Sequence, residues 1–149
     1  MNTHSPIGRT LAAASLSIIG LSGSACSGES EGEGSADARV QIVEPEAGAT
    51  LAGPDVRIVL AAHGVDIVPA GMDQPNSGHH HLFLNREVTP DGETIPAGVE
   101  GVVHLGGAQT EYVFEGLAPG EYTLIAQLGD LAHVPVETVA RDTVRFVVN

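Results

Sequence analysis

The chain has 149 residues and a formal net charge of −13, which comes from 19 acidic residues against six arginines and no lysine. This acidity argues against nucleic acid or anionic lipid as a partner held by charge, because both are polyanionic. A single cysteine excludes an intramolecular disulfide, and the absence of tryptophan argues against a broad aromatic platform for sugars.

Residues 1–25 have the pattern of a secretory signal peptide. Arg9 precedes an apolar stretch from residue 11 to residue 21, and small residues occupy positions 23–25. The apolar stretch is too short, and too interrupted by glycine and serine, to span a bilayer permanently. We therefore expect export from the cytoplasm, with His4 lost together with the signal.

Cys26 follows this segment directly, and its position resembles the lipobox of bacterial lipoproteins, in which the cysteine becomes the lipidated first residue. Gly23 departs from that pattern, since the lipobox usually has leucine three residues before the cysteine. Lipidation at Cys26 would anchor the protein to a bacterial envelope membrane outside the cytoplasm, facing the periplasm or the surface. The alternative is simple secretion with a free thiol.

Residues 26–38 form a predicted linker. After Cys26 it contains only serine, glycine, glutamate, alanine and aspartate, which cannot bury enough apolar surface to offset the conformational entropy of folding. Such a flexible tether has a reach of roughly 20 Å. Residues 39–149 have a suitable length for one domain with a single core.

Alternation with a period of two residues recurs along residues 39–149, and helical periodicity does not. The alternating segments lie at residues 40–43, 56–61, 122–128 and 144–148. Turn signals rich in glycine and proline separate them. We predict an all-β fold, a single immunoglobulin-like antiparallel β-sandwich of about seven strands. Tyr122, just after a Pro-Gly turn, predicts a tyrosine corner, with an ordinary core tyrosine as the alternative.

Three consecutive histidines precede an apolar run in Gly78-His79-His80-His81-Leu82. If Leu82 faces the core, His80 shares its side, whereas His79 and His81 face the other way, about 6.6 Å apart along the strand. Two histidines in that relation can chelate one ion. We expect His80 to be a hydrogen-bonded buried or rim residue, which supports the ligands or replaces one of them.

Two further histidines, His104 and His133, lie in separate segments bounded by turns. Asp130, three residues before His133, adds a carboxylate. Whether these side chains meet the triple histidine decides whether a site exists. His63 falls on the polar phase of its strand, and we expect it to face solvent.

Four motifs follow one another along the domain, and they are GHHHL at residues 78–82, HLGGAQTE at 104–111, PGEYTL at 119–124 and LGD..HVP at 128–135. In this order they resemble the bacterial exported family known as domain of unknown function 4399, over essentially the whole globular part. The resemblance implies a small exported or lipid-anchored bacterial protein with no established activity. The family often has histidines where this chain has Leu131 and Val102, so two ligands of relatives would be lost here.

Metal binding is the function that these residues favour most sharply. The candidate ligands are His79, His81, His104, His133 and Asp130. Neutral imidazoles with a carboxylate or water suit Zn(II) or Cu(II), and the lack of an available thiolate argues against iron-sulfur and blue-copper centres. Met72 is a candidate soft ligand, although a lone methionine in a loop more often serves packing.

Two alternatives remain open. The histidines and Asp130 would form a hydrogen-bond cluster that locks loops over one end of the sandwich, or they would form a recognition surface for an envelope protein or glycan. Catalysis is the least supported function, because the chain has no nucleophile elbow, phosphate loop or metalloprotease helix motif. We therefore expect a protein that is not an enzyme and has no nucleic-acid partner.

Overall fold

The computed structural model describes residues 37–149, and this part of the chain is built from β-strands. The predicted signal peptide at residues 1–25, the lipidation site Cys26 and all but the last two residues of the predicted 26–38 linker lie outside it. Within residues 37–149, no helix is long and apolar enough to cross a membrane.

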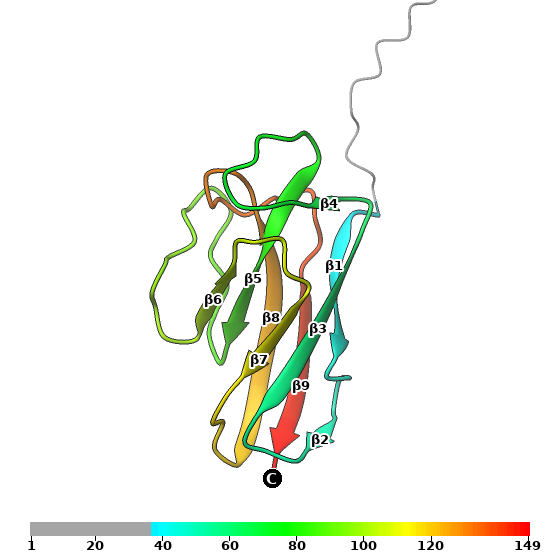
Figure 1. Cartoon of the computed structure of the whole chain (residues 1–149), viewed down its shortest axis with the longest axis vertical. Helices are drawn as coiled ribbons and strands as arrows, with labels where there is room; N and C mark the ends of the chain where they lie inside the picture. Colours follow the sequence, from blue (N-terminus) through cyan, green and yellow to red (C-terminus); the bar gives the residue numbers. More distant parts are fainter. Residues whose placement is uncertain (1–36) are drawn as a thin grey trace, which may run out of the picture.

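The strands of this region form two sheets that pack into a sandwich (Figure 1). In chain order they are β1 (Arg39–Glu44), β2 (Thr50–Leu51), β3 (Val56–His63), β4 (Asp66–Ile67), β5 (Ser77–Leu84), β6 (Val102–Leu105), β7 (Glu111–Phe114), β8 (Gly120–Gly129) and β9 (Asp142–Val148). One sheet has the order β1-β3-β7. The other has the order β2-β9-β8-β5-β4, and β6 pairs with β5 beside β4.

The period-two pattern of the sequence explains the core. Val40 and Ile42 of β1 are buried, as are Val56, Ile58 and Leu60 of β3, while the residues between them are more exposed. Alternate residues of β9 face inward in the same way. Each sheet therefore turns one apolar face toward the other, which is the arrangement expected of a β-sandwich.

The predicted all-β sandwich is confirmed. The four alternating segments of the sequence correspond to β1, β3, β8 and β9. The long strands pair antiparallel as predicted, and the short strands β2 and β4 add parallel pairs with β9 and β5. β2 and β4 are two residues long, so each parallel pairing involves only two residues of each strand. The immunoglobulin-type strand arrangement stays a prediction.

β5 is buried on both faces. His80 and Leu82 point between the sheets, and His79, His81 and Phe83 point to the outer side, yet all five are at most 1% exposed. Antiparallel sheets usually leave one face to solvent. The outer face of β5 must therefore be covered by another part of the chain.

The segment between β5 and β6, residues 85–101, provides that cover and lies beside β6 in Figure 1. Ile95 and Thr89 of this segment are buried, at 3% and 7% exposure. The carbonyl of Thr89 accepts a hydrogen bond of 3.1 Å from the side chain of Gln127, which lies opposite His81 on β8. The segment is thus attached to the sheet that it covers.

The predicted tyrosine corner is present. The Tyr122 hydroxyl donates a hydrogen bond of 2.8 Å to the carbonyl oxygen of Ala118, four residues earlier. The ring of Tyr122 stacks against Phe146 on β9 with 5.5 Å between centroids. The residue therefore fixes the turn that leads into β8.

Replacing Tyr122 with phenylalanine should lower the free energy of unfolding by about 1 kcal/mol, the usual net value of one hydrogen bond. Urea unfolding followed by circular dichroism measures this change. Tyr112→Phe, which removes a hydroxyl from β7, is the matched control and should cost less. Equal effects of the two substitutions would show that the bond to Ala118 has no special weight.

Candidate metal centre

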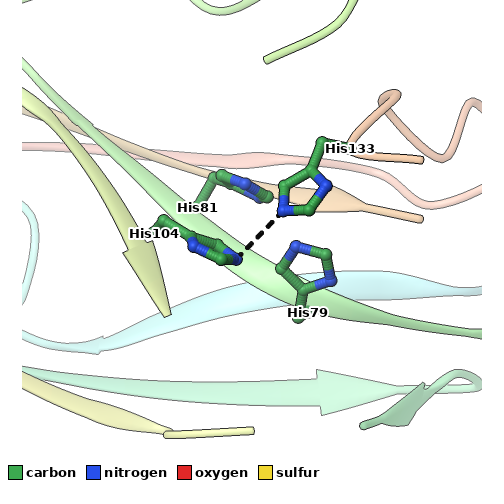
Figure 2. A group of neighbouring side chains, drawn as sticks. All are labelled: His79, His81, His104 and His133. Atoms are coloured by element: carbon green, nitrogen blue, oxygen red, sulfur yellow. Dashed lines mark hydrogen bonds between the residues drawn. The ribbon is translucent and has the colours of Figure 1, made fainter. Parts of the chain in front are cut away.

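The outer face of β5 provides the first two histidines of the site (Figure 2). His79 and His81 are two residues apart on the strand, and each is 1% exposed. Across the sheet, His79 pairs with Gly129 of β8. A side chain at Gly129 would collide with the His81 ring, because a Cβ there would lie 2.6 Å from the Cε1 atom of His81. Gly129 therefore leaves the space that His81 occupies.

β6 provides the third histidine. His104 lies directly opposite His81 in the antiparallel pairing of β5 and β6, so the two rings stack with centroids 5.0 Å apart. His104 is exposed, unlike the two histidines of β5. Gly106 is close to the His104 ring, since a Cβ at that position would lie 2.5 Å from Cε1 and 2.7 Å from Nε2.

The turn after β8 provides the fourth histidine. His133 has a φ of 59°, the left-handed conformation that costs a residue other than glycine on the order of 1 kcal/mol or more. Asp130 holds this turn, because its Oδ1 accepts hydrogen bonds from the amides of Ala132 at 2.8 Å and Val134 at 2.9 Å. The carbonyl of His133 accepts a hydrogen bond of 2.8 Å from the amide of Ile95. The covering segment thus also positions His133.

These four side chains, which we call the histidine cluster, converge: His79, His81, His104 and His133. One ligand nitrogen from each lies within 4.8 Å of the others. Nε2 of His133 and Nε2 of His104 lie 3.2 Å apart. Metal–nitrogen bonds of about 2.0 Å in a tetrahedron place the nitrogens about 3.3 Å apart. The His104–His133 pair has this spacing, whereas nitrogens as far apart as 4.8 Å would have to move closer together to bind one tetrahedral ion.

Two buried ring nitrogens of the cluster have no hydrogen-bond partner among the described residues, Nε2 of His79 and Nδ1 of His81. The other two histidines share the contact between their Nε2 atoms. Buried polar groups in folded proteins are hydrogen-bonded in the great majority of cases. Both nitrogens of His80, on the other face of β5, also lack a partner, so the convergence of four imidazoles is the observation that favours a ligand here.

Sequence reasoning placed the remaining candidates less well. Asp130 is not part of the converging group, and the structure shows it instead as the residue that shapes the turn carrying His133. His80 is buried as expected, but the predicted hydrogen bond is wrong, because neither of its ring nitrogens has a partner among residues 37–149. His63 is exposed as expected, and its Nε2 lies 3.3 Å from the Gln41 side chain.

A family model for the domain of unknown function DUF4399 matches residues 58–149, which include the whole histidine cluster. The chain belongs to this family. No curated protein matches it. A solved structure of an engineered protein is similar over 76% of this chain and 20% of its own length, with 15% identity and a TM-score of 0.45. The function must therefore be argued from the site of this DUF4399 domain itself.

Burial keeps His79 and His81 uncharged at neutral pH. It lowers the pKa of His79 to about 4 and that of His81 to about 3, and the positive charge that neighbouring histidines would carry acts in the same direction. The carboxylate of Asp130 opposes this effect at His79. The pKa of His104 is also lowered, first by burial and then by His133. Neutral imidazole is the form that binds metal, so protons compete weakly for these rings at pH 7.

Several residues that build the site carried no recognisable signal in the sequence. Gly106 and Gly129 matter because ring atoms of His104 and His81 fill the space beside them. Ile95 covers the outer face from a segment without alternation. Gly106 and Gly129 lie within the motifs HLGGAQTE and LGD..HVP, each of which also contains a histidine. Their position near a histidine in the sequence was the available clue.

The free energy of unfolding of the metal-free protein should fall as the pH is lowered from 6.5 toward 4. Burial lowers the pKa of His80 to about 4, whereas in the unfolded chain it is near 6.5, so between these values the unfolded state binds more protons. The full effect of His80 alone is on the order of 3 kcal/mol. The contribution of His80 to the free energy of unfolding is fully present above pH 6.5 and is lost as the pH falls toward 4.

Urea unfolding at several pH values tests this expectation. His80→Leu removes the titrating group and should reduce the slope of stability against pH by about one proton. His63→Leu, which removes an exposed histidine, is the control for the loss of one imidazole. A slope in the His80 variant equal to that of the parent would contradict the assignment.

Proposed function

We propose that this protein binds one divalent transition metal ion, Zn(II) or Cu(II), in the histidine cluster, and does so while lipid-anchored outside the cytoplasm of a bacterium. The observation that carries the first part is the convergence of the four rings of the histidine cluster, whose ligand atoms lie within 4.8 Å of one another, with Nε2 of His104 and Nε2 of His133 in contact at 3.2 Å. An ion at the centre would satisfy all four rings at once.

The donor set narrows the choice of metal. Imidazole nitrogen suits zinc, copper, nickel and iron, whereas magnesium and calcium prefer oxygen. Zinc and copper lie at or near the high-affinity end of the divalent series, so a site of four imidazoles without a thiolate favours these two. The acidic surface of the chain also draws cations toward it.

The coordination supports binding without catalysis. Four protein ligands complete a tetrahedral shell, whereas catalytic zinc sites keep one position open for water. Two ligands lie on β5, which is buried on both faces, and the ring of His104 is exposed to solvent. This combination suits a protein that holds or carries a metal ion.

The envelope location rests on the sequence. The apolar stretch before Cys26 and the acidic linker after it agree with a lipoprotein that holds its domain away from the membrane. Zn(II) and Cu(II) outside the cytoplasm would then reach the histidine cluster directly.

Metal content of the full-length chain, purified without a histidine tag, tests the binding proposal. Elemental mass spectrometry should find close to one zinc or copper ion per chain. Added metal at about a hundredfold excess over Kd should raise the free energy of unfolding by about 2.7 kcal/mol, which corresponds to a rise of roughly 10 °C in Tm. A chelator should reverse this rise.

The double variant His104→Ala, His133→Ala should lose both the bound metal and the rise in Tm. His63→Ala, which removes an exposed histidine outside the cluster, should keep both. A parent protein that is purified without bound metal and whose Tm does not change when metal is added would contradict the proposal. A structural cluster or a recognition surface would then be the better account of the histidines.

Gly106→Ala gives a test in which all four ligand residues are retained. The added methyl group would overlap the Nε2 side of the His104 ring, so that ring must turn away from the cluster. Metal affinity should fall by about ten- to a hundredfold, the usual loss when a supporting group is removed. Stability without metal should change little, because the exposed His104 ring can move into solvent.

Competition with a chromophoric chelator measures the affinity of this variant. Gly120→Ala on β8 is the matched control, since nothing lies within 4 Å of the position of its added methyl group. Unchanged affinity in Gly106→Ala would show that His104 is not a ligand.

A further inference from the structure

A pocket of about 280 Å³ lies directly beside the histidine cluster. His79 forms part of its wall, together with residues 130–132 of the turn that carries His133 and the segment of residues 68–74. His79 is therefore shared between the cluster and the pocket. Its Nε2 is one of the buried nitrogens without a partner.

Met72 lines the same pocket and is 48% exposed. A packing role, which is the usual one for a methionine in a loop, does not fit this exposure. Met72 also provides the sole sulfur atom of residues 37–149, since the other sulfur-bearing residues of the chain are Met1 and Cys26. Its thioether is thus a soft donor in the wall of the pocket that His79 also lines.

The backbone around Met72 is tied to the strands that carry the histidines. The amide of Val68 donates to the carbonyl of Gly78 at 2.9 Å, next to His79, and the amide of Ala70 donates to the carbonyl of Gly106 at 2.8 Å. The amide of Met72 then closes a turn onto the carbonyl of Pro69 at 3.1 Å. These bonds tie the backbone of residues 68–72 to the strands beside the pocket.

The chemistry of these two donors selects a metal. Thioether sulfur binds Cu(I) but is a poor ligand for Zn(II), while imidazole binds both metals. The carboxylates of Asp73 and Asp130 also line the pocket and favour a cation there. Met72 offers a soft donor at the surface of the pocket, and His79 offers a nitrogen donor in its wall. Copper would first bind at such a place.

We propose that Met72 and His79 form an entry site for Cu(I) in this pocket, from which the ion passes into the histidine cluster. The inference rests on the proposed function and extends it, because the histidine cluster would then receive copper as Cu(I) in addition to the divalent ions proposed above. Transfer requires one exchange of ligands, in which the thioether leaves and a nitrogen of His104 or His133 takes its place. The ion stays Cu(I) throughout, so no oxidant or reductant takes part in the step.

Cu(I) affinity of the full-length chain tests the entry site. Every arm carries Cys26→Ser, since a free thiol would itself bind Cu(I). Competition with a chromophoric Cu(I) chelator without oxygen compares the parent with Met72→Leu. We expect the variant to bind Cu(I) about ten- to a hundredfold more weakly. We expect its Zn(II) affinity and its Tm without metal to match the parent.

Leu131→Ala is the matched control, because Leu131 lines the same pocket at the same 48% exposure and has no donor atom. It should leave Cu(I) affinity unchanged. X-ray absorption of the Cu(I)-loaded parent should show sulfur in the copper shell, and Met72→Leu should remove that signal. This signature separates a ligand from a residue that only shapes the pocket.

The possible outcomes separate the two proposals. Unchanged Cu(I) affinity in Met72→Leu, in a parent whose Zn(II) binding needs His104 and His133, would overturn the entry site and leave the histidine cluster standing. Equal losses of Zn(II) and Cu(I) in Met72→Leu would also overturn it, since the loop would then act by positioning His79. A parent that binds neither ion would overturn both proposals.

Discussion

The site depends on the double burial of β5. Because side chains alternate along a strand, neighbouring histidines of the triple face opposite sides, and the sheet divides them into His80 toward the core and the pair His79 and His81 away from it. Without the covering segment of residues 85–101, the outer pair would lie in water. With that cover, the two rings are desolvated and neutral, and His104 and His133 complete the group around them.

This arrangement has a cost in stability. A buried polar atom without a partner costs on the order of 1–3 kcal/mol, and the partnerless ring nitrogens of the described residues lie on His79, His80 and His81. The left-handed backbone at His133 adds a further cost. A bound ion would offset the cost at His79 and His81, since it takes the place of the missing partners. It would not reach His80, which lies on the other face of the strand.

The sequence allowed much of this to be predicted, because alternation is a local property. Alternation alone separates His80 from His79 and His81, and the Pro-Gly signal places Tyr122 just after a turn. The convergence of His104 and His133 on β5 depends on strand register and on a turn held by Asp130, which are properties of the whole sheet. The roles of Gly106, Gly129 and Ile95 depend on empty or filled space, which no local pattern in the sequence records.

The register of the cluster has a mechanical consequence. β6 is a strand of four residues that pairs with β5 alone among the described strands, and His133 lies 29 residues beyond His104 in the chain. A single ion would therefore act as a cross-link between an edge strand, a central strand and a distant turn. It would close long stretches of chain into loops, at an entropic cost that grows only slowly with their length. Occupancy would then decide whether this edge of the sandwich opens locally or moves as one piece with the core.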